Sequence, residues 1–527
     1  MSAAEPVAWP AGGPYHHGID RRRSHMRFTS LVIELIRARP LLVVWLVVGA
    51  QALLWFVVPM LVYASPPGDV ATVLAYGREY QVGTDLGPPL AFWLADLAYR
   101  AAGEHIFGVY LLAQICFVVT FVALYRLGRA IAGPQHAVVA VILTSTITAF
   151  ASDGTAFGPM ILARPLWALA LLHIWQVIGQ GRRNAWFALS LEVGLLLLTT
   201  TAAPVLLLLP LGFALATARG RRAFLSLDTA FSVLVIAALV VPYAVWLIRA
   251  DLWASLSLPA NADIAERAQI GGIYVLMLLL SAAGVAVLTL FNNGRFAPKN
   301  DDSPVVVRQP VDPLARGFVY VFALGPLLLA GVGAAVFGPA QLAGCGGIAL
   351  LLTGLAVVVT GADVVAIHRQ RLLRSIWAAL VVAPAVAVIG GAVVQPWIGR
   401  TELPTAIPAK DIARFFGEAF ERRTGKPLPA VAGDPELASL VAMGASRPRL
   451  LLDATPARTP WINLASFQQT GGIVVWRAAD TAGKPPEEIA KRFPDIVPEL
   501  PRAFDRLIAG RQPLIRIGWA IVRPKTP

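Results

Sequence analysis

Charged side chains are scarce in this sequence, and their scarcity excludes an ordinary soluble protein. Asp, Glu, Lys and Arg make up 14% of the 527 residues, whereas 57% are hydrophobic; a soluble domain carries about 25% charged residues. The apolar residues form runs long enough for a helix to cross about 30 Å of hydrocarbon. A spanning segment must satisfy its own backbone hydrogen bonds, and the runs lack the two-residue alternation of a membrane barrel. The composition therefore predicts an all-α, polytopic membrane domain.

Cysteine and histidine are also rare, with two and seven residues respectively. Cys116 and Cys345 both fall inside apolar runs, where a cysteine behaves as a small buried residue, so a disulfide is not expected. No His, Cys and carboxylate residues cluster at the spacing of a structural metal site. The sequence also has neither a phosphate-binding loop nor a dinucleotide fingerprint.

The apolar runs predict about eleven membrane spans. Their expected ranges are 41–64, 107–127, 136–152, 159–179, 185–200, 202–217, 229–249, 270–291, 317–337, 343–365 and 375–395. The first run is too long for a signal peptide and is expected to remain as a span. Basic residues concentrate in alternate loops and in the polar N-terminal segment, which places the N-terminus in the cytoplasm. Topology thus accounts for the net charge of +13, and no nucleic-acid partner is inferred.

An odd number of spans places the C-terminal region on the outer side of the membrane. An amphipathic helix is expected there, with Ile412, Phe416 and Phe420 on one face. Short apolar runs alternate with helix-like stretches after it, which is typical of a small α/β domain. We assign Asp434, Asp453 and Trp461 to capping and turn positions. The expected regions are therefore a cytoplasmic segment (1–39), a transmembrane domain (40–397) and a periplasmic α/β domain (398–527).

The first outer loop, residues 65–103, contains the most informative residues. Asp69 leaves the membrane at the start of the loop. A short surface helix is expected after it, and a second helix is expected after Pro88 and Pro89. We expect the apolar face of the second helix to leave Asp96 and Arg100 outside. Two interfacial helices below an acidic residue favour a roof over a lipid-facing cavity.

An ordered set of short motifs resembles glycosyltransferase family 39, which includes protein O-mannosyltransferases and lipid A aminoarabinose transferases. The motifs are Gly68-Asp69, the proline-led segment 88–94, residues 124–129, residues 165–170 and Thr199-Thr200. The resemblance covers residues 40–220 best. It implies the C-type glycosyltransferase fold. It also implies transfer of a sugar from a polyprenyl-phosphate donor to a lipid, glycan or protein acceptor on the outer face of the bacterial inner membrane.

The resemblance implies that Asp69 is the acidic residue of the first outer loop, which acts as general base or orients the acceptor hydroxyl. The alternative is that Asp69 only caps the following helix. A second acidic role falls to Asp85, to Asp153 or to neither. The resemblance implies no certain cofactor, although the acidic loop is a possible site for a divalent cation.

Four arginines are candidates for binding the donor phosphate: Arg78, Arg100, Arg164 and Arg267. The alternative for the exposed ones is that they anchor the protein at the membrane interface. Arg164 and Glu192 are both expected about 8–12 Å below the outer surface, from about 1.5 Å of rise per residue. An ion pair between them would relieve the free-energy cost of two buried charges.

Two other functions remain open on the sequence alone. A transporter or lipid flippase would show internal repeats and acidic residues at the bilayer midplane, and neither is evident. A non-catalytic scaffold is left open by Val70, which stands where the family carries a second acidic residue.

Overall fold

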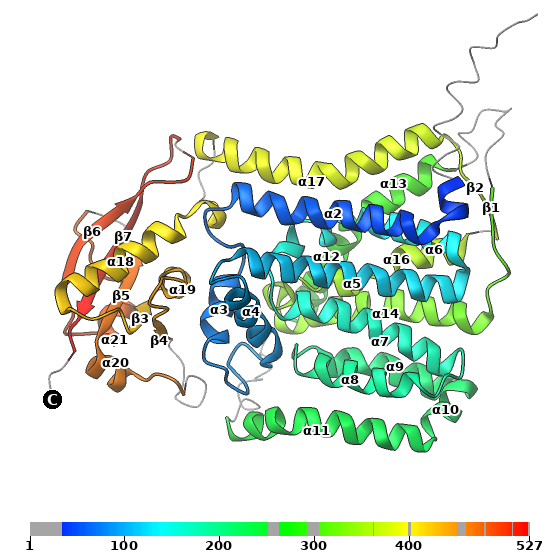
Figure 1. The fold of residues 1–527 in the computed structure, drawn as a ribbon, viewed down its shortest axis with the longest axis horizontal. Helices are drawn as coiled ribbons and strands as arrows, with labels where there is room; N and C mark the ends of the chain where they lie inside the picture. The colour runs from blue at the N-terminus through cyan, green and yellow to red at the C-terminus, as the bar shows by residue number, and fades with distance from the viewer. Residues whose placement is uncertain are drawn as a thin grey trace, which may run out of the picture.

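A computed structural model describes residues 34–250, 263–293, 305–361, 363–398, 402–451, 460–478, 481–508 and 510–524. A bundle of long helices occupies most of the molecule, and a smaller α/β domain sits at one end of it (Figure 1). We refer to this end as the domain end of the bundle and to the opposite end as the far end. The predicted N-terminal segment lies almost wholly outside the described residues.

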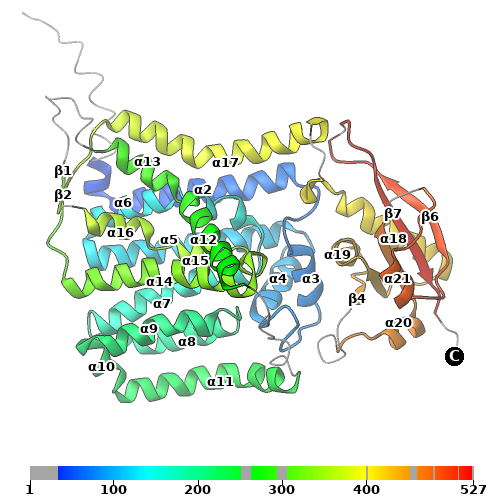
Figure 2. The same ribbon diagram turned by 180° about the vertical axis from the view of Figure 1, so that it is seen from behind.

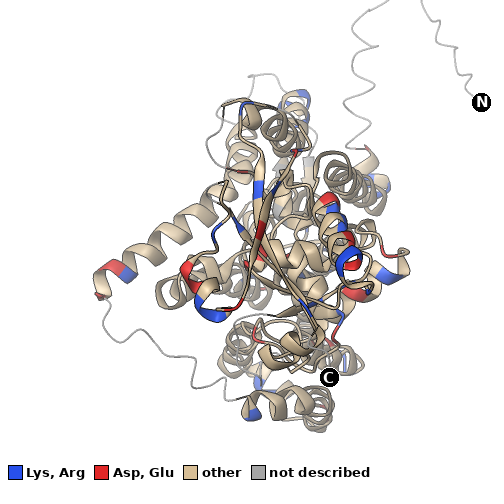
Figure 3. Ribbon diagram, turned by 90° about the vertical axis from the view of Figure 1, so that its left-hand side faces the viewer, with Lys and Arg blue, Asp and Glu red and all other residues tan. Residues whose placement is uncertain are grey.

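Seven helices of the described chain are long and apolar enough to cross a membrane. They are α2 (Pro40–Val62), α5 (Phe107–Ala132), α7 (Pro159–Ile178), α11 (Leu227–Arg249), α12 (Ile264–Ser281), α14 (Pro313–Phe337) and α17 (Gln370–Ile398). Each of them falls on a predicted span. The ribbon of the bundle carries few charged residues when it is seen from the domain end (Figure 3).

The remaining predicted spans correspond to shorter or broken helices. These are α6 (Pro134–Thr144), α8 (Ala185–Leu197), α9 (Ala203–Ala216), α10 (Ala218–Phe224), α15 (Gly346–Ala349) and α16 (Thr353–Thr360), while α13 (Ala283–Phe291) continues α12 after a break. The helix α6 ends earlier than expected because the hydroxyls of Ser145 and Thr146 donate to the carbonyls of Ile142 and Leu143. Such local bonds compete with helix continuation. The chain continues in the 3₁₀ turns η1 (Thr148–Phe150) and η2 (Ser152–Thr155).

Helices α5, α6, α7 and α14 form the centre of the bundle, whereas α11 and α17 lie at its edge. Phe318 and Phe322 of α14 pack against Phe213 at ring distances of 5.4 and 5.7 Å. Only 11% of the apolar window of α11, and 6% of that of α17, is buried. A helix that is apolar on its exposed side suits contact with lipid rather than with water. These features confirm the predicted polytopic helical domain.

The C-terminal domain is built on a five-stranded sheet with the order β4-β3-β5-β7-β6. Its strands are β3 (Ala430–Gly433), β4 (Arg449–Leu451), β5 (Gly472–Arg477), β6 (Pro498–Phe504) and β7 (Ile515–Val522), and its helices are α18 (Ala409–Thr424), α19 (Pro435–Ala442), α20 (Leu464–Thr470) and α21 (Glu487–Arg492). Strands β3, β4 and β5 are parallel, and β7 and β6 extend them in antiparallel register. The predicted α/β domain is confirmed. Asp434 caps α19 as expected, whereas Asp453 lies outside the described residues.

Two short helices of the first loop connect the bundle to this domain. Helix α3 (Val70–Gly77) and helix α4 (Leu90–Ala101) lie between the bundle and α19 (Figures 1 and 2). Their buried side chains belong to the same hydrophobic cluster as Ile412, Phe416 and Trp519 of the C-terminal domain. The Thr72 hydroxyl also lies 2.9 Å from that of Ser439. The roof predicted over the bundle is therefore also the seat of the C-terminal domain.

A two-stranded sheet lies at the far end of the bundle. Strand β1 (Val305–Val307) pairs antiparallel with β2 (Val364–Ala366). The Arg308 side chain is buried beside it, where its guanidinium donates to the carbonyls of Val358, Val359 and Gly361 at the end of α16. Asp363 balances its charge at 2.9 Å.

Candidate functional site

Asp69 begins the first loop with an exposed side chain. The preceding Gly68 has a φ of +56°, and a Cβ built on it would lie 3.2 Å from the Cβ of Ala156. Asp69 stands at the N-cap position of α3, yet its side chain makes no capping hydrogen bond. Of the two roles predicted for it, the capping role is therefore wrong. The Asp69 side chain is therefore exposed at the domain end without a capping bond.

The loop between α6 and α7 lies directly beside Asp69. Ala156 of this loop lies next to Gly68. Phe157 is buried in one hydrophobic cluster with Val70 and Val73 of α3. The backbone of Asp153 lies in η2, three residues before Ala156. The structure thus brings the chain segments of Asp69 and Asp153 together, while the Asp153 side chain lies outside what the structure describes.

Arg164 lies behind the Asp153 loop, one turn into α7. Its Nη2 atom donates to the Gly344 carbonyl at 3.0 Å, and its guanidinium lies 5.6 Å from the centre of the Phe150 ring. The residue is 3% exposed. A Cβ on Gly347 would come within 2.3 Å of the Arg164 Nε, so the glycine leaves the space that the side chain occupies. Arg164 is therefore held where it can support the loop.

The predicted ion pair between Arg164 and Glu192 is wrong. Glu192 pairs instead with the Nδ1 atom of His173 at 2.8 Å. Helices α7 and α8 form an antiparallel hairpin with a short connection at 179–184, so the register places Glu192 opposite His173. Arg164 lies nine residues away along α7, a rise of about 13 Å.

Asp85 lies near the opposite end of α3, in the turn before α4. Thr84 and Gly87 exchange backbone hydrogen bonds of 3.1 and 3.0 Å around it. Its carboxylate lies beside the buried Tyr76 hydroxyl, whose pKa is raised by burial and further by the Asp85 charge. This turn is also fixed to the bundle, because the Leu90 amide donates to the Leu198 carbonyl at 3.0 Å.

Asp96 contradicts the orientation predicted for α4. The carboxylate is fully buried and accepts hydrogen bonds from the Tyr80 hydroxyl at 2.8 Å and from Arg100 Nε at 2.6 Å. It also accepts from Arg447 Nη2 in the C-terminal domain. The exposed position is taken by Leu97, at 51%. In a membrane protein the most apolar helix face turns to lipid, so an acidic residue with partners turns inward.

Arg78 and Arg100 both lie where the first loop meets the C-terminal domain. The charge of Arg100 is balanced by Asp96, whereas the buried Nη1 of Arg78 has no hydrogen-bond partner among the described residues. The pKa of Arg78 is lowered by burial and by the charges of Arg447, Arg449 and Arg100, against the opposing effect of Glu79. An anion beside Arg78 would relieve this repulsion. Among the four arginines predicted to bind phosphate, Arg78 therefore has the electrostatic surroundings that best suit a bound anion.

Arg267 lies apart from both groups, in the first turn of α12. Four residues later, Gly271 packs against Gly331 of α14, where a Cβ would come within 2.6 Å of the Gly331 carbonyl oxygen. In the part of the chain that the structure describes, no three His, Cys, Asp or Glu side chains converge as a metal site would require. A divalent cation at the acidic loop stays a prediction.

The sequence could not reveal several residues of this region. Tyr76, Arg447 and Arg449 carry no local motif, and their importance comes from contacts across the fold. Arg449 reaches Glu79 at 3.6 Å, and the Trp461 ring lies 5.3 Å from that of Tyr76. The one available signal was the four-residue spacing of Asp96 and Arg100, which suits an ion pair along a helix.

Comparisons with known proteins place these features in a family context. Residues 87–246 match the family described as dolichyl-phosphate-mannose-protein mannosyltransferase. Two crystal structures of ArnT from Cupriavidus metallidurans, one bound to undecaprenyl phosphate and one in the apo state, each align with a TM-score of 0.55 and 14% identity. They cover 92% and 90% of this chain and 98% and 97% of their own chains. No curated protein sequence matches the chain.

The alignment over nearly the full length confirms the predicted C-type glycosyltransferase fold with a small C-terminal α/β domain. The family match confirms the resemblance over the motifs from residue 88 to Thr200, while Gly68-Asp69 precedes the matched residues. At 14% identity, the structural likeness speaks for the fold, and function has to be argued from the site.

Proposed function

We propose, on the premise of this fold and family match, that the chain is a membrane glycosyltransferase. It moves a sugar from a polyprenyl-phosphate donor to a lipid, glycan or protein acceptor on the outer face of the bacterial inner membrane. The observation that carries the proposal is Asp69, a carboxylate without a capping bond, beside the Asp153 loop at the domain end. The family match also supports the proposal, because it begins at residue 87, within the same first loop.

In the proposed reaction, the Asp69 carboxylate accepts the proton of the acceptor hydroxyl. The hydroxyl oxygen then forms a bond to the anomeric carbon of the donor sugar. The bond between that carbon and the phosphate oxygen breaks, and polyprenyl phosphate leaves with the electron pair. A base placed in this way contributes about 10²–10⁴-fold to the rate.

We assign donor-phosphate binding to Arg78, whose buried Nη1 atom has no hydrogen-bond partner among the described residues. A guanidinium can form two parallel hydrogen bonds to phosphate oxygens. Arg164 acts as a positioning residue for the Asp153 loop, since its bonds lie inside the bundle. Asp69 and Arg78 are the residues that flank helix α3, so the length of this helix sets the spacing of the two functions.

Sugar transfer by the purified chain tests this proposal. The full chain is reconstituted in proteoliposomes and given a panel of radiolabelled polyprenyl-phosphate sugars with crude envelope acceptors. Transfer of label to any acceptor supports the proposal. No transfer from any donor by a folded protein would overturn it in favour of a scaffold whose working part is the C-terminal domain.

A further inference from the structure

A cavity of about 340 Å³ opens at the far end of the bundle and contains none of the residues assigned to sugar transfer. It lies between the α7–α8 connection and helix α10, which Figure 1 places opposite the C-terminal domain. Four arginines and a single acidic residue line it: Arg182, Arg183, Arg219, Arg222 and Asp228. The lining is therefore strongly basic.

The fold holds α10 against this cavity. The chain turns by 110° between α9 and α10. The Thr217 side chain caps α10 by accepting from the Gly220 amide at 3.2 Å. A Cβ on Gly220 would come within 2.5 Å of the Ala214 carbonyl, so the close return of the chain requires a glycine there. Arg219 fixes this turn to the start of α14 through an ion pair with the N-cap residue Asp312 at 3.1 Å.

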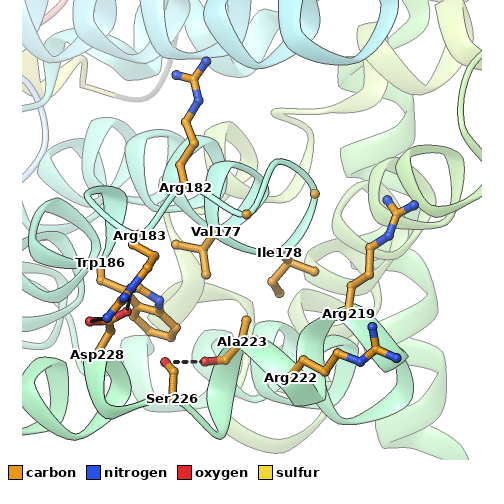
Figure 4. Close-up of a pocket in the computed structure, with 12 residues that line it drawn as sticks. Val177, Ile178, Arg182, Arg183, Trp186, Arg219, Arg222, Ala223, Ser226 and Asp228 are labelled. Carbon is orange, nitrogen blue, oxygen red and sulfur yellow. Dashed lines mark hydrogen bonds and ion pairs between the residues drawn. The ribbon is translucent and has the colours of Figure 1, made fainter.

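The arginines of the cavity differ in how their charges are balanced. Arg183 forms a two-bond ion pair with Asp228, at 2.7 and 3.0 Å. The guanidinium groups of Arg182 and Arg222 have no protein partner among the described residues. Figure 4 shows them extending in different directions from different elements, Arg182 from the α7–α8 connection and Arg222 from α10. The cavity thus carries positive charge that the protein does not neutralise.

The rest of the lining is mainly apolar and buried, and exposed apolar residues follow at the rim. Val177 and Ile178 lie between the arginines of the α7–α8 connection and those of α10 (Figure 4). The buried Trp186 ring lies on the same side as the Arg183–Asp228 pair. Leu225 and Leu227 flank Ser226 at the rim and are 88% and 77% exposed. They begin the exposed apolar side of α11. A ligand with a charged head and an apolar tail would match both parts of this surface.

We propose that this cavity binds the phosphate headgroup of an anionic phospholipid. In the proposed complex the long side chains of Arg182 and Arg222 turn toward the phosphate oxygens, and the acyl chains follow Leu225, Leu227 and the exposed side of α11. Basic pockets between membrane helices are a known chemical solution for anionic lipid headgroups. The site does not depend on the proposed sugar transfer, because it uses none of the residues assigned to that reaction.

Native mass spectrometry of the detergent-purified full chain tests the proposal. The protein is incubated with phosphatidylglycerol or with phosphatidylcholine of the same acyl chains, each with and without inorganic phosphate. The pocket variant combines Arg182→Gln with Arg222→Gln. The control combines Arg126→Gln with Arg129→Gln, which removes the same charge from exposed residues near the far end of α5.

We expect the parent and the control to retain phosphatidylglycerol in preference to phosphatidylcholine. The pocket variant should retain it roughly tenfold less or weaker still, because it lacks two arginines near an anionic headgroup. Equal retention by all three proteins, or an equal loss in both variants, would overturn the site. Displacement of phosphatidylglycerol by inorganic phosphate, with no preference between the two lipids, would overturn the lipid as its occupant.

Discussion

Asp96 shows how one buried residue connects two parts of the chain. Its partners come from the first loop and from Arg447, 351 residues away. A carboxylate without exposure is tolerated only when charged or polar partners surround it. The sequence contained Asp96 and Arg447, but neither local spacing nor hydropathy could report a contact over such a separation. The sequence therefore predicted that Asp96 lies outside the apolar face of α4, whereas the structure buries its side chain completely.

Replacing Arg447 with Met should destabilise the protein by about 1–3 kcal/mol, since a buried carboxylate loses a charged partner but keeps Tyr80 and Arg100. Thermal unfolding in detergent measures the change. The control is Arg414→Met, because Arg414 and Asp411 form an exposed pair with 71% and 61% of their side chains accessible. An exposed pair contributes about 1 kcal/mol or less. Equal stability of the two variants would show that Asp96 does not depend on Arg447.

Arg78 gives a second prediction for a single residue. Arg78→Gln should raise the KM for the polyprenyl-phosphate donor roughly tenfold and leave kcat nearly unchanged, because a charged hydrogen bond contributes about 1.5–3 kcal/mol. Initial rates over a range of donor concentrations separate the two constants. A fall in kcat at constant KM would instead mean that Arg78 acts only after the donor has bound.

At the scale of the element, the lengths of helices were easier to predict than their orientation. Apart from α12, which ends at Ser281 within the span expected at 270–291, the long apolar helices begin and end near their expected residues. A membrane span has a characteristic length. The face of α4 and the register of α7 against α8 were predicted wrongly. Both depend on neighbours, as with Glu192, whose partner proved to be His173 and not Arg164.

The packing of α3 on α4 can be tested at Gly77. A Cβ at this position would come within 2.2 Å of the Phe92 carbonyl oxygen. Gly77→Ala should therefore force the two helices apart and destabilise the protein by about 1–3 kcal/mol. Gly417→Ala is the control, since Gly417 lies within α18 with no atom in the path of a Cβ. Calorimetry that finds both variants as stable as the parent would contradict the close contact.

At the scale of the molecule, the bundle and the C-terminal domain share a hydrophobic cluster through α3 and α4. The sequence predicted both regions, because each has its own pattern of apolar residues. It could not predict that the roof of the bundle is the surface on which the C-terminal domain sits. That contact places the proposed donor-binding Arg78 beside Arg447 and Arg449, so the C-terminal domain contributes charge to the site.

The proposed orientation in the membrane is tested by labelling with a membrane-impermeant maleimide. Cysteine at exposed Gln469, in the C-terminal domain, should react in intact cells whose outer membrane is permeabilised. Cysteine at exposed Arg126 should react only after the inner membrane is opened. The native Cys116 and Cys345 are buried and should give little background. The reverse pattern would place the C-terminal domain in the cytoplasm.

The most direct test of the central claim is sugar transfer by Asp69→Asn in proteoliposomes. The asparagine keeps the size of the side chain but cannot accept the hydroxyl proton. Asp411→Asn is the control, because it makes the same change at an exposed position of α18. We predict that Asp69→Asn lowers transfer by about 10²–10⁴-fold while the control transfers at the parental rate. Parental transfer by a folded Asp69→Asn protein would contradict the assignment of Asp69 as the base.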